Sequence, residues 1–246
     1  MHPPFFHPFS GKGRSIALRP YGCSLRIGSL NKMGKLILVR HGHTCLNVPG
    51  RDERLRGWLD LPLDDQGLHE AAETADRLAD YPVEAIYSSD LRRARQTAEV
   101  LRRRSRAPRV TTTNELRPWN LGVFCGQRVM DILPFLNLLN RHPDLAAPSG
   151  ESFYQFYGRY SRRLTDLMNL ASQSSQCIVA VTHVRNVLAS QTVIEHGNPD
   201  HVPVRGGPPT GTLIVVEKQD GIWKMRTDSS KPHLIVPQPV LAEARA

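Results

Sequence analysis

The chain has 246 residues, of which 40% are hydrophobic, and a formal net charge of +9 at pH 7. This length allows one large domain or two small ones, and we expect one. Four cysteines at unrelated spacings exclude a disulfide framework and a zinc site, and no apolar run approaches the roughly 20 residues that span a bilayer. Composition therefore predicts a soluble, cytoplasmic protein with reduced thiols, no metal and no other cofactor.

The positive charge is concentrated in two places. Residues 1–33 carry five basic residues and no acidic residue, and eight arginines lie between Arg92 and Arg109 without aromatic residues among them. Such a run is more often a solvated helix face than a nucleic-acid site, so we disfavour nucleic acid as a partner. A phosphorylated small molecule explains part of the charge equally well.

The two ends of the chain differ from its middle. Residues 1–33 lack helical or strand periodicity, and the residues after Ser229 are rich in proline. We expect a disordered extension over 1–33, one domain over 34–228 and a disordered tail over 229–246.

The first predicted element is a strand over Leu36–Val39, whose consecutive aliphatic residues indicate burial on both faces. It ends at Arg40-His41-Gly42, where an imidazole lies beside a guanidinium and a glycine permits close approach to the backbone. This arrangement suits a nucleophile that faces an anion, although a histidine in this place is more often a hydrogen-bonded structural residue. Other parts of the chain must therefore supply the residues that would act together with His41.

The pattern then alternates between helices and strands. We expect Asp64 to be the N-cap of a helix that runs to Ala79. We expect either Ser89 or Asp90 to cap a helix over 92–104. The other predicted elements are strands over 84–88, 110–116 and 177–181, helices over 127–140, 152–173 and 186–195, and a hairpin over 212–217 and 222–226 that turns at Asp220-Gly221. We predict an α/β fold, a single three-layer domain with a mostly parallel central sheet flanked by helices.

Functional residues follow three of these strands. Because the carboxyl ends of parallel strands meet at one edge of a sheet, we expect His41, Arg40, Arg93 and His183 to lie together. Helix N-termini at that edge add free amides and partial positive charge, which suits a phosphoryl group. The cations neutralise its oxygens and lower the pKa of His41, so this histidine can attack as a neutral imidazole.

Five segments, in the expected order, resemble the signature of the histidine phosphatase superfamily, the phosphoglycerate mutase-like enzymes. They are Arg40-His41-Gly42-x-Thr44-x-x-Asn47, Gly57-Trp58-x-Asp60-x-Pro62-Leu63, Ser89-x-Leu91-x-Arg93-Ala94-x-Gln96-Thr97-Ala98, Gly150-Glu151-Ser152 and Thr182-His183. The resemblance covers about residues 35–217.

This resemblance implies a phosphohistidine intermediate at His41 and no metal. It implies that Arg40, Arg93 and His183 are catalytic and contact the phosphoryl group. It also implies substrate contacts near Thr44 and Asn47, to which we add Arg56 and Gly57 as substrate-binding residues.

Two positions depart from the family pattern. Many members have a glutamate proton donor four residues before the glycine that corresponds to Gly122, but this chain has Pro118 there, and Val184 replaces a frequent glycine after the second histidine. Glu151 and Glu115 are the possible replacement donors. The alternation of a strand would turn Glu115 to the opposite side, and either carboxylate is more often structural.

Hydrolysis is the reaction that we expect, because mutases of this family have a longer and more basic insertion than the short, apolar segment 126–150. The predicted function is a phosphatase that hydrolyses phosphorylated small molecules through a phosphohistidine on His41. The alternatives are a phosphoglycerate mutase-type phosphotransferase, or a catalytically weak protein that binds a phosphorylated ligand or nucleic acid. Nucleic-acid binding would be sensitive to salt and would survive loss of His41. The sequence specifies neither the substrate nor the oligomeric state.

Overall fold

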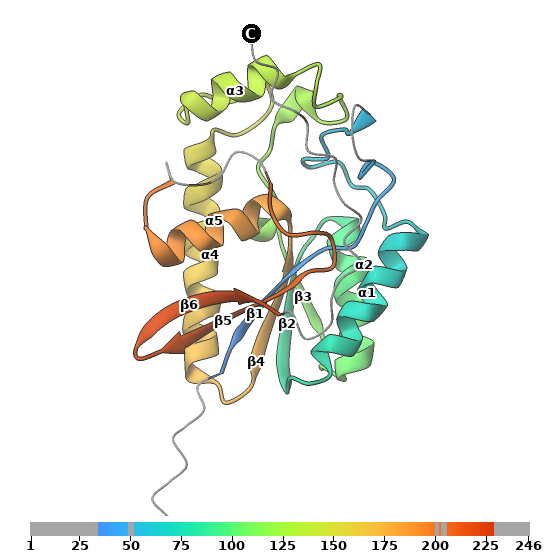
Figure 1. The fold of residues 1–246 in the computed structure, drawn as a ribbon, viewed down its shortest axis with the longest axis vertical. Coiled ribbons are helices and arrows are strands. Elements are labelled where there is room, and N and C mark those ends of the chain that lie inside the picture. The colour runs from blue at the N-terminus through green and yellow to red at the C-terminus, as the bar shows by residue number, and fades with distance from the viewer. Residues whose placement is uncertain (1–33, 49–51, 200–201, 203–205, 229–246) are drawn as a thin grey trace, which may run out of the picture. The chain divides into compact units, whose positions relative to one another are not determined.

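A computed structural model describes residues 34–48, 52–199, 202 and 206–228. The disordered segments predicted over 1–33 and 229–246 lie outside these ranges. The described residues form an α/β structure around a six-stranded sheet, so the predicted fold class is confirmed (Figure 1). No helix in this part of the chain combines the length and the apolar character needed to cross a membrane.

The sheet places the two histidines of interest next to each other. Its strands are β1 (Leu36–Arg40), β2 (Val83–Ser89), β3 (Val110–Thr113), β4 (Cys177–Thr182), β5 (Leu213–Gln219) and β6 (Ile222–Thr227), in the order β3-β2-β4-β1-β5-β6. The first four strands in this order are parallel, and β5 and β6 pair antiparallel. In the centre, Arg40 of β1 is in register with Thr182 of β4. His41 and His183, which follow these residues, therefore leave the sheet at the same edge.

Helices cover both faces of the sheet. They are α1 (Asp65–Leu78), α2 (Arg92–Ser105), α3 (Leu133–Arg141), α4 (Phe153–Gln173) and α5 (Val184–Glu195). Figure 1 shows α1 and α2 on one side of the sheet and α4 and α5 on the other. Alternation along β1 serves both sides, because Leu36 and Leu38 join one buried cluster, whereas Ile37 and Val39 join the other.

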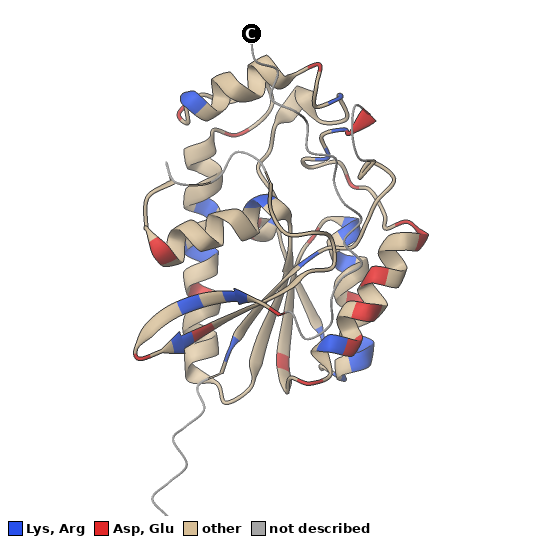
Figure 2. Cartoon of the chain, in the orientation of Figure 1, with Lys and Arg blue, Asp and Glu red and all other residues tan. Residues whose placement is uncertain are grey.

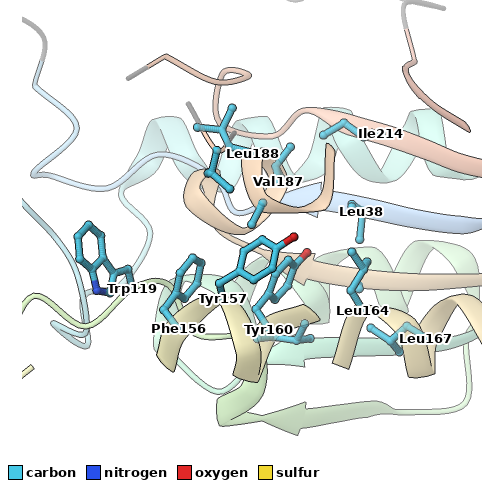
Figure 3. Packing of buried hydrophobic residues seen from close by; sticks show 14 of the residues in the cluster. Leu38, Trp119, Phe156, Tyr157, Tyr160, Leu164, Leu167, Val187, Leu188 and Ile214 are labelled. Carbon is cyan, nitrogen blue, oxygen red and sulfur yellow. The ribbon is translucent and has the colours of Figure 1, made fainter. Parts of the chain in front are cut away.

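Aromatic residues of α4 fill the core beneath α5, as Figure 3 shows. Phe156 and Tyr160 are fully buried, and their rings stack with centroids 6.1 Å apart. The Tyr160 hydroxyl lies 2.6 Å from Oγ of Ser190 on α5, which satisfies a polar group that would otherwise be costly to bury. This packing fixes α5, and α5 begins directly after His183.

Two local predictions are confirmed. Asp64 is the N-cap of α1, and its side chain accepts a hydrogen bond from the backbone N–H of Gly67 at 2.9 Å. Asp220 and Gly221 join β5 to β6 with φ values of +53° and +80°, the backbone that a tight hairpin turn requires.

The predicted caps of α2 are wrong. Leu91 occupies the N-cap position, so neither Ser89 nor Asp90 caps this helix. The carboxylate of Asp60 accepts the hydrogen bond from the backbone N–H of Arg92 instead. A residue distant in sequence thus replaces the local cap, which a search for neighbouring capping residues does not find.

Several element boundaries also differ from the predictions. The strand predicted over 110–116 ends at Thr113, whose hydroxyl accepts from the N–H of Glu115 and starts a 3₁₀ helix over Asn114–Leu116. The helix predicted over 127–140 begins only at Leu133, with a proline in its first turn. The helix predicted over 186–195 begins at Val184.

The arginine cluster at the end of α2 forms ion pairs with acidic residues. Arg102 and Arg103 lie 2.7 and 3.1 Å from the carboxylate of Glu99, and Arg104 lies 2.6 Å from Asp76 of α1. Figure 2 shows basic and acidic residues mixed where these two helices run together. These pairs match a solvated helix face, the reading that the sequence favours.

Candidate active site

The histidine pair, His41 and His183, lies beyond the ends of β1 and β4. Their ring centroids are 4.9 Å apart and their planes are inclined by 62°. Arg93, in the first turn of α2, donates from Nε to Nε2 of His41 at 3.2 Å. The three residues are at most 3% exposed. The structure therefore brings together, with the adjacent Arg40, the four residues that the sequence predicts to be catalytic.

A backbone contact fixes the tautomer of His41. Its Nδ1 lies 2.7 Å from the carbonyl oxygen of Gly42. A carbonyl oxygen only accepts hydrogen bonds, so Nδ1 must carry the proton and Nε2 must hold the lone pair. Nε2 is the atom that faces Arg93. The reactive nitrogen of His41 thus points to the positively charged part of the site.

Both histidines are held neutral. Burial lowers the pKa of His41 well below its usual value of 6.5, and the nearby guanidinium groups of Arg93 and Arg40 lower it further. The pKa of His183 is lowered in the same way, mainly by burial and then by Arg93. The neutral form is the nucleophilic form of imidazole, so His41 is prepared to attack without first losing a proton.

Three arginines, of which Arg93 is buried and the other two half-buried, surround the pair and are held mainly by backbone carbonyls. Arg93 donates to the carbonyls of Gly57 (2.8 Å) and Leu59 (2.6 Å), and Arg40 donates to a carbonyl of the loop before β5. Burial, and after it repulsion from Arg56, lowers the pKa of Arg40 and of Arg93 to about 9. Both therefore remain cationic at neutral pH. Arg56, the third, has one carboxylate partner, Glu53, at 3.7 Å.

Several polar atoms at this site lack a partner. Within the described residues, neither ring nitrogen of His183 nor Nε of Arg40 makes a hydrogen bond, although these atoms are buried. An unsatisfied buried polar group costs about 1–3 kcal/mol. Together with the excess of positive charge, these groups indicate a site for an anion with several oxygen atoms, such as a phosphoryl group.

The four residues predicted to bind substrate occupy different positions around this site. The buried Thr44 donates from its backbone N–H and its hydroxyl to Oδ1 of Asn47, at 3.0 and 2.8 Å. Gly57 supplies a carbonyl that orients Arg93. Arg56 donates to the Leu46 carbonyl at 2.9 Å and lies close enough to His41 to lower its pKa. The structure therefore brings Arg56 to the cationic cluster and gives the other three a supporting geometry.

The two possible proton donors are engaged elsewhere. Glu151 lies 2.6 Å from Arg159 and accepts from the backbone N–H of Asn120 at 2.9 Å. Glu115 accepts from the Thr113 hydroxyl at 3.2 Å, and because it lies in a 3₁₀ helix, strand alternation does not govern its direction. In the described part of the chain, neither carboxylate has a hydrogen bond or ion pair with the histidine pair or Arg93.

The loop before β5 carries contacts that the sequence did not indicate. The carbonyl of Gly211 accepts from the Thr74 hydroxyl (2.7 Å) and from Arg77 (2.8 Å), and its N–H donates to the carbonyl of Arg40 (3.0 Å). The carbonyl of Pro208 in the same loop accepts from the Arg40 side chain. Helix α1 thus positions Arg40 through this loop, and only the glycines and prolines of the loop mark it in the sequence.

A pocket of about 380 Å³ is formed in part by the loop that holds Arg93, and we call it the side pocket. It is lined by Trp58, Leu59, Asn120, Gly122, Val123, Cys125 and Ser149. Leu59 joins the pocket to the site, because its carbonyl holds Arg93 and Arg93 contacts His41. The sequence marked Trp58 and Gly122 as motif positions but gave no indication of a pocket.

Among the described residues, no three or more His, Cys, Asp or Glu side chains lie in an arrangement that could hold a metal ion.

Comparison with known proteins identifies the family. The family model of the histidine phosphatase superfamily (branch 1) matches residues 36–228. The chain belongs to the histidine phosphatase superfamily. As a member of this superfamily, the chain carries the family's Arg-His-Gly segment at the end of β1 and the second histidine at the end of β4.

The relatives of the chain carry different names. It is 31% identical over 156 residues to phosphoglycerate mutase-like protein 4 of Arabidopsis thaliana, a match that covers 61% of this chain and 66% of the relative. It is 33% identical over 186 residues to glucosyl-3-phosphoglycerate phosphatase of Mycolicibacterium vanbaalenii, covering 72% and 80%. A solved mycobacterial glucosyl-3-phosphoglycerate phosphatase in complex with VO3 superposes with a TM-score of 0.65 at 26% identity, covering 79% and 97%. The chain thus spans about two thirds of the first of these relatives and nearly all of the solved structure.

Proposed function

We propose that the protein is a phosphatase that hydrolyses phosphorylated small molecules through a phosphohistidine intermediate on His41. The observation that carries the proposal is the contact of 2.7 Å between Nδ1 of His41 and the carbonyl of Gly42. It leaves the lone pair on Nε2, which faces a cluster of guanidinium groups. A neutral nitrogen among buried cations is suited to attack a phosphorus atom that bears anionic oxygens.

The reaction has two steps. Nε2 of His41 attacks phosphorus, the new N–P bond forms, and the bond to the leaving oxygen breaks with its electron pair on that oxygen. Arg40, Arg93 and an N–H of His183 stabilise the phosphoryl oxygens. Water then attacks the phosphohistidine, the N–P bond breaks, and the electron pair returns to Nε2 as inorganic phosphate forms. Phosphoryl transfer depends mainly on positioning and charge stabilisation, which buried arginines fixed by carbonyls provide.

We assign indirect roles to three residues that the sequence predicts to bind substrate. The mutual hydrogen bonds of Thr44 and Asn47 support a role in holding the loop after His41, and the carbonyl of Gly57 supports a role in orienting Arg93. Arg56 is the remaining candidate for a direct contact. No step in this mechanism requires a metal, so we propose that activity is metal-independent and survives dialysis against EDTA. The unpaired thiols of the described cysteines fit the cytoplasmic location that we propose.

A phosphoglycerate mutase-type transferase is the second candidate, and the similarity to phosphoglycerate mutase-like protein 4 favours it. A mutase must return the phosphoryl group from His41 to its substrate before water attacks. The two candidates are separated by incubating the protein with 3-phosphoglycerate and with a panel of other phosphorylated small molecules, and by measuring phosphate release and isomerisation in the same samples. Phosphate release without isomerisation supports the phosphatase, and isomerisation without release supports the mutase.

A further inference from the structure

The side pocket is adjacent to the place where a leaving group must emerge. Arg93 contacts His41 through Nε, while its Nη atoms donate to the carbonyls of Gly57 and Leu59. Leu59 and the residue after Gly57, Trp58, are both part of the pocket wall. Arg93 therefore connects the nucleophile to the loop that forms this wall. A phosphoryl group bound at the histidine pair would place its ester substituent within reach of this wall.

The side pocket is suited to an apolar group. Trp58, Leu59, Val123 and Cys125 contribute apolar surface, and Val123 is 51% exposed at its edge. Some polar groups of the lining already make hydrogen bonds within the protein. The side chain of Asn120 accepts a hydrogen bond from the N–H of Gly122 at 3.0 Å and donates one to the carbonyl of Ser149 at 3.4 Å. A sugar or other hydroxyl-rich group would have to compete for these hydrogen bonds, whereas a flat apolar group would not.

Trp58, which forms part of the wall of the side pocket, is held in place by two contacts. The indole Nε1 donates to the carbonyl of Pro118 at 2.8 Å, and the guanidinium of Arg117 lies 4.5 Å from the ring centroid. Arg117 is in turn held by both carboxylate oxygens of Asp90 at 2.7 Å. A wall fixed in this way is preformed, so little ordering is needed when a ligand binds beside it.

The side pocket contains neither of the side chains that most often protonate a leaving alkoxide, a carboxylic acid or a histidine. The nearby carboxylate of Glu151 is bound by Arg159, and that of Asp60 accepts from the N–H of Arg92. A positioned general acid typically contributes 10²–10⁴-fold to such a step, so its absence penalises leaving groups of high pKa.

We propose that the side pocket binds an aromatic leaving group and that the preferred substrates are aryl phosphate monoesters. This inference rests on the proposed function. The bond between Nε2 of His41 and phosphorus forms, and the bond between phosphorus and the aryl oxygen breaks with its electron pair on that oxygen. The phenolate is stable enough to leave without a proton and takes one up from solvent, since a phenol has a pKa of about 10.

The test measures single-turnover formation of the phosphoenzyme with phenyl phosphate, benzyl phosphate and acetyl phosphate. Phenyl and benzyl phosphate are similar in size, but benzyl alcohol is much the weaker acid. We expect phenyl phosphate to react at least about 100-fold faster than benzyl phosphate, the lower limit of what a general acid would supply. Acetyl phosphate has a good leaving group that is too small to fill the pocket, so it reports on the phosphoryl site.

Pocket variants test the second part of the inference. Val123→Asn should lower kcat/KM for phenyl phosphate relative to acetyl phosphate by about 10-fold, as expected for lost apolar contact in a pocket. Val123→Thr, which is nearly the same size, should lower this ratio less and guards against misfolding of the first variant. Ile222→Asn is the matched control, because Ile222 is 64% exposed on β6, at the outer edge of the sheet. It should leave the ratio unchanged.

The outcomes separate the inference from the proposed function. Rapid phosphorylation of His41 by acetyl phosphate, with equal rates for phenyl and benzyl phosphate, would overturn the inference and leave the phosphatase proposal intact. An unchanged selectivity ratio in both Val123 variants would do the same. If no phosphate donor phosphorylates His41, the proposed function fails and the inference fails with it.

Discussion

Gly57 is the position where one methyl group should disturb both stability and activity. Its φ is +42°, and a Cβ atom added there would lie 2.3 Å from Sγ of Cys125. The left-handed backbone costs a non-glycine residue about 1–2 kcal/mol, and overpacking adds about 1–3 kcal/mol. At about 2–4 °C for each kcal/mol in a domain of this size, Gly57→Ala should lower Tm by roughly 4–20 °C.

The activity of Gly57→Ala should also fall, for a reason that is independent of its stability. The Gly57 carbonyl accepts from Arg93 at 2.8 Å, and Arg93 contacts Nε2 of His41. A hydrogen bond to a charged group contributes about 1.5–3 kcal/mol, so a displaced carbonyl should lower kcat/KM by roughly 10- to 100-fold. The assay combines thermal unfolding with steady-state hydrolysis of an aryl phosphate, at a temperature where the variant is fully folded.

Three other substitutions separate the causes. The double variant Gly57→Ala/Cys125→Ala removes the sulfur and leaves only the Cβ of residue 125, at 3.7 Å. It should regain the stability lost to overpacking but not the stability lost to the left-handed backbone. Gly221→Ala, at φ +80° in open space, reports the backbone cost alone, and Gly158→Ala, inside α4 with open space, should be neutral or stabilising. A Gly57→Ala protein with the stability and activity of the parent would refute this reasoning.

Two further predictions follow from the buried charges. Because the pKa values of His41 and His183 are lowered in the folded state, the unfolded chain takes up protons below pH 6.5 that the folded chain does not, so stability falls as pH drops. Each histidine should lower the free energy of unfolding by about 1.4 kcal/mol per pH unit until its folded pKa is reached. Urea unfolding of His41→Asn should therefore show a shallower dependence of the free energy of unfolding on pH at acid pH. An unchanged dependence would contradict the lowered pKa. Inorganic phosphate at 100 times its Kd should stabilise the protein by about 2.7 kcal/mol, which raises Tm by about 5–11 °C. This shift should disappear in Arg93→Ala, and a shift that persists would place the anion elsewhere.

The sequence predicts the fold well where local chemistry decides it. The aliphatic run of β1 and the Asp64 cap of α1 produce the expected elements because their causes lie within a few neighbouring residues. The cap of α2 was missed because Asp60 reaches it from another loop. The end of β3 was missed because the Thr113 hydroxyl turns the chain into a 3₁₀ helix.

The site shows the same division between local and distant causes. Strand-end positions and parallel pairing suffice to bring His41, Arg93 and His183 together. They do not show that Glu151 is neutralised by Arg159, because that pair joins a turn to the second turn of α4. The side pocket also escapes the sequence, since separate loops form its lining.

Locating the phosphoryl group during turnover tests whether His41 is the nucleophile. The protein is quenched after brief incubation with a fast phosphate donor, and the modified residue is identified by mass spectrometry. We predict phosphate on His41 that is stable to alkali and labile to acid, no phosphoenzyme and no turnover in His41→Ala, and slower turnover with accumulated phosphoenzyme in His183→Ala. Acid-labile phosphate on His183 with none on His41, or turnover that survives His41→Ala, would contradict it.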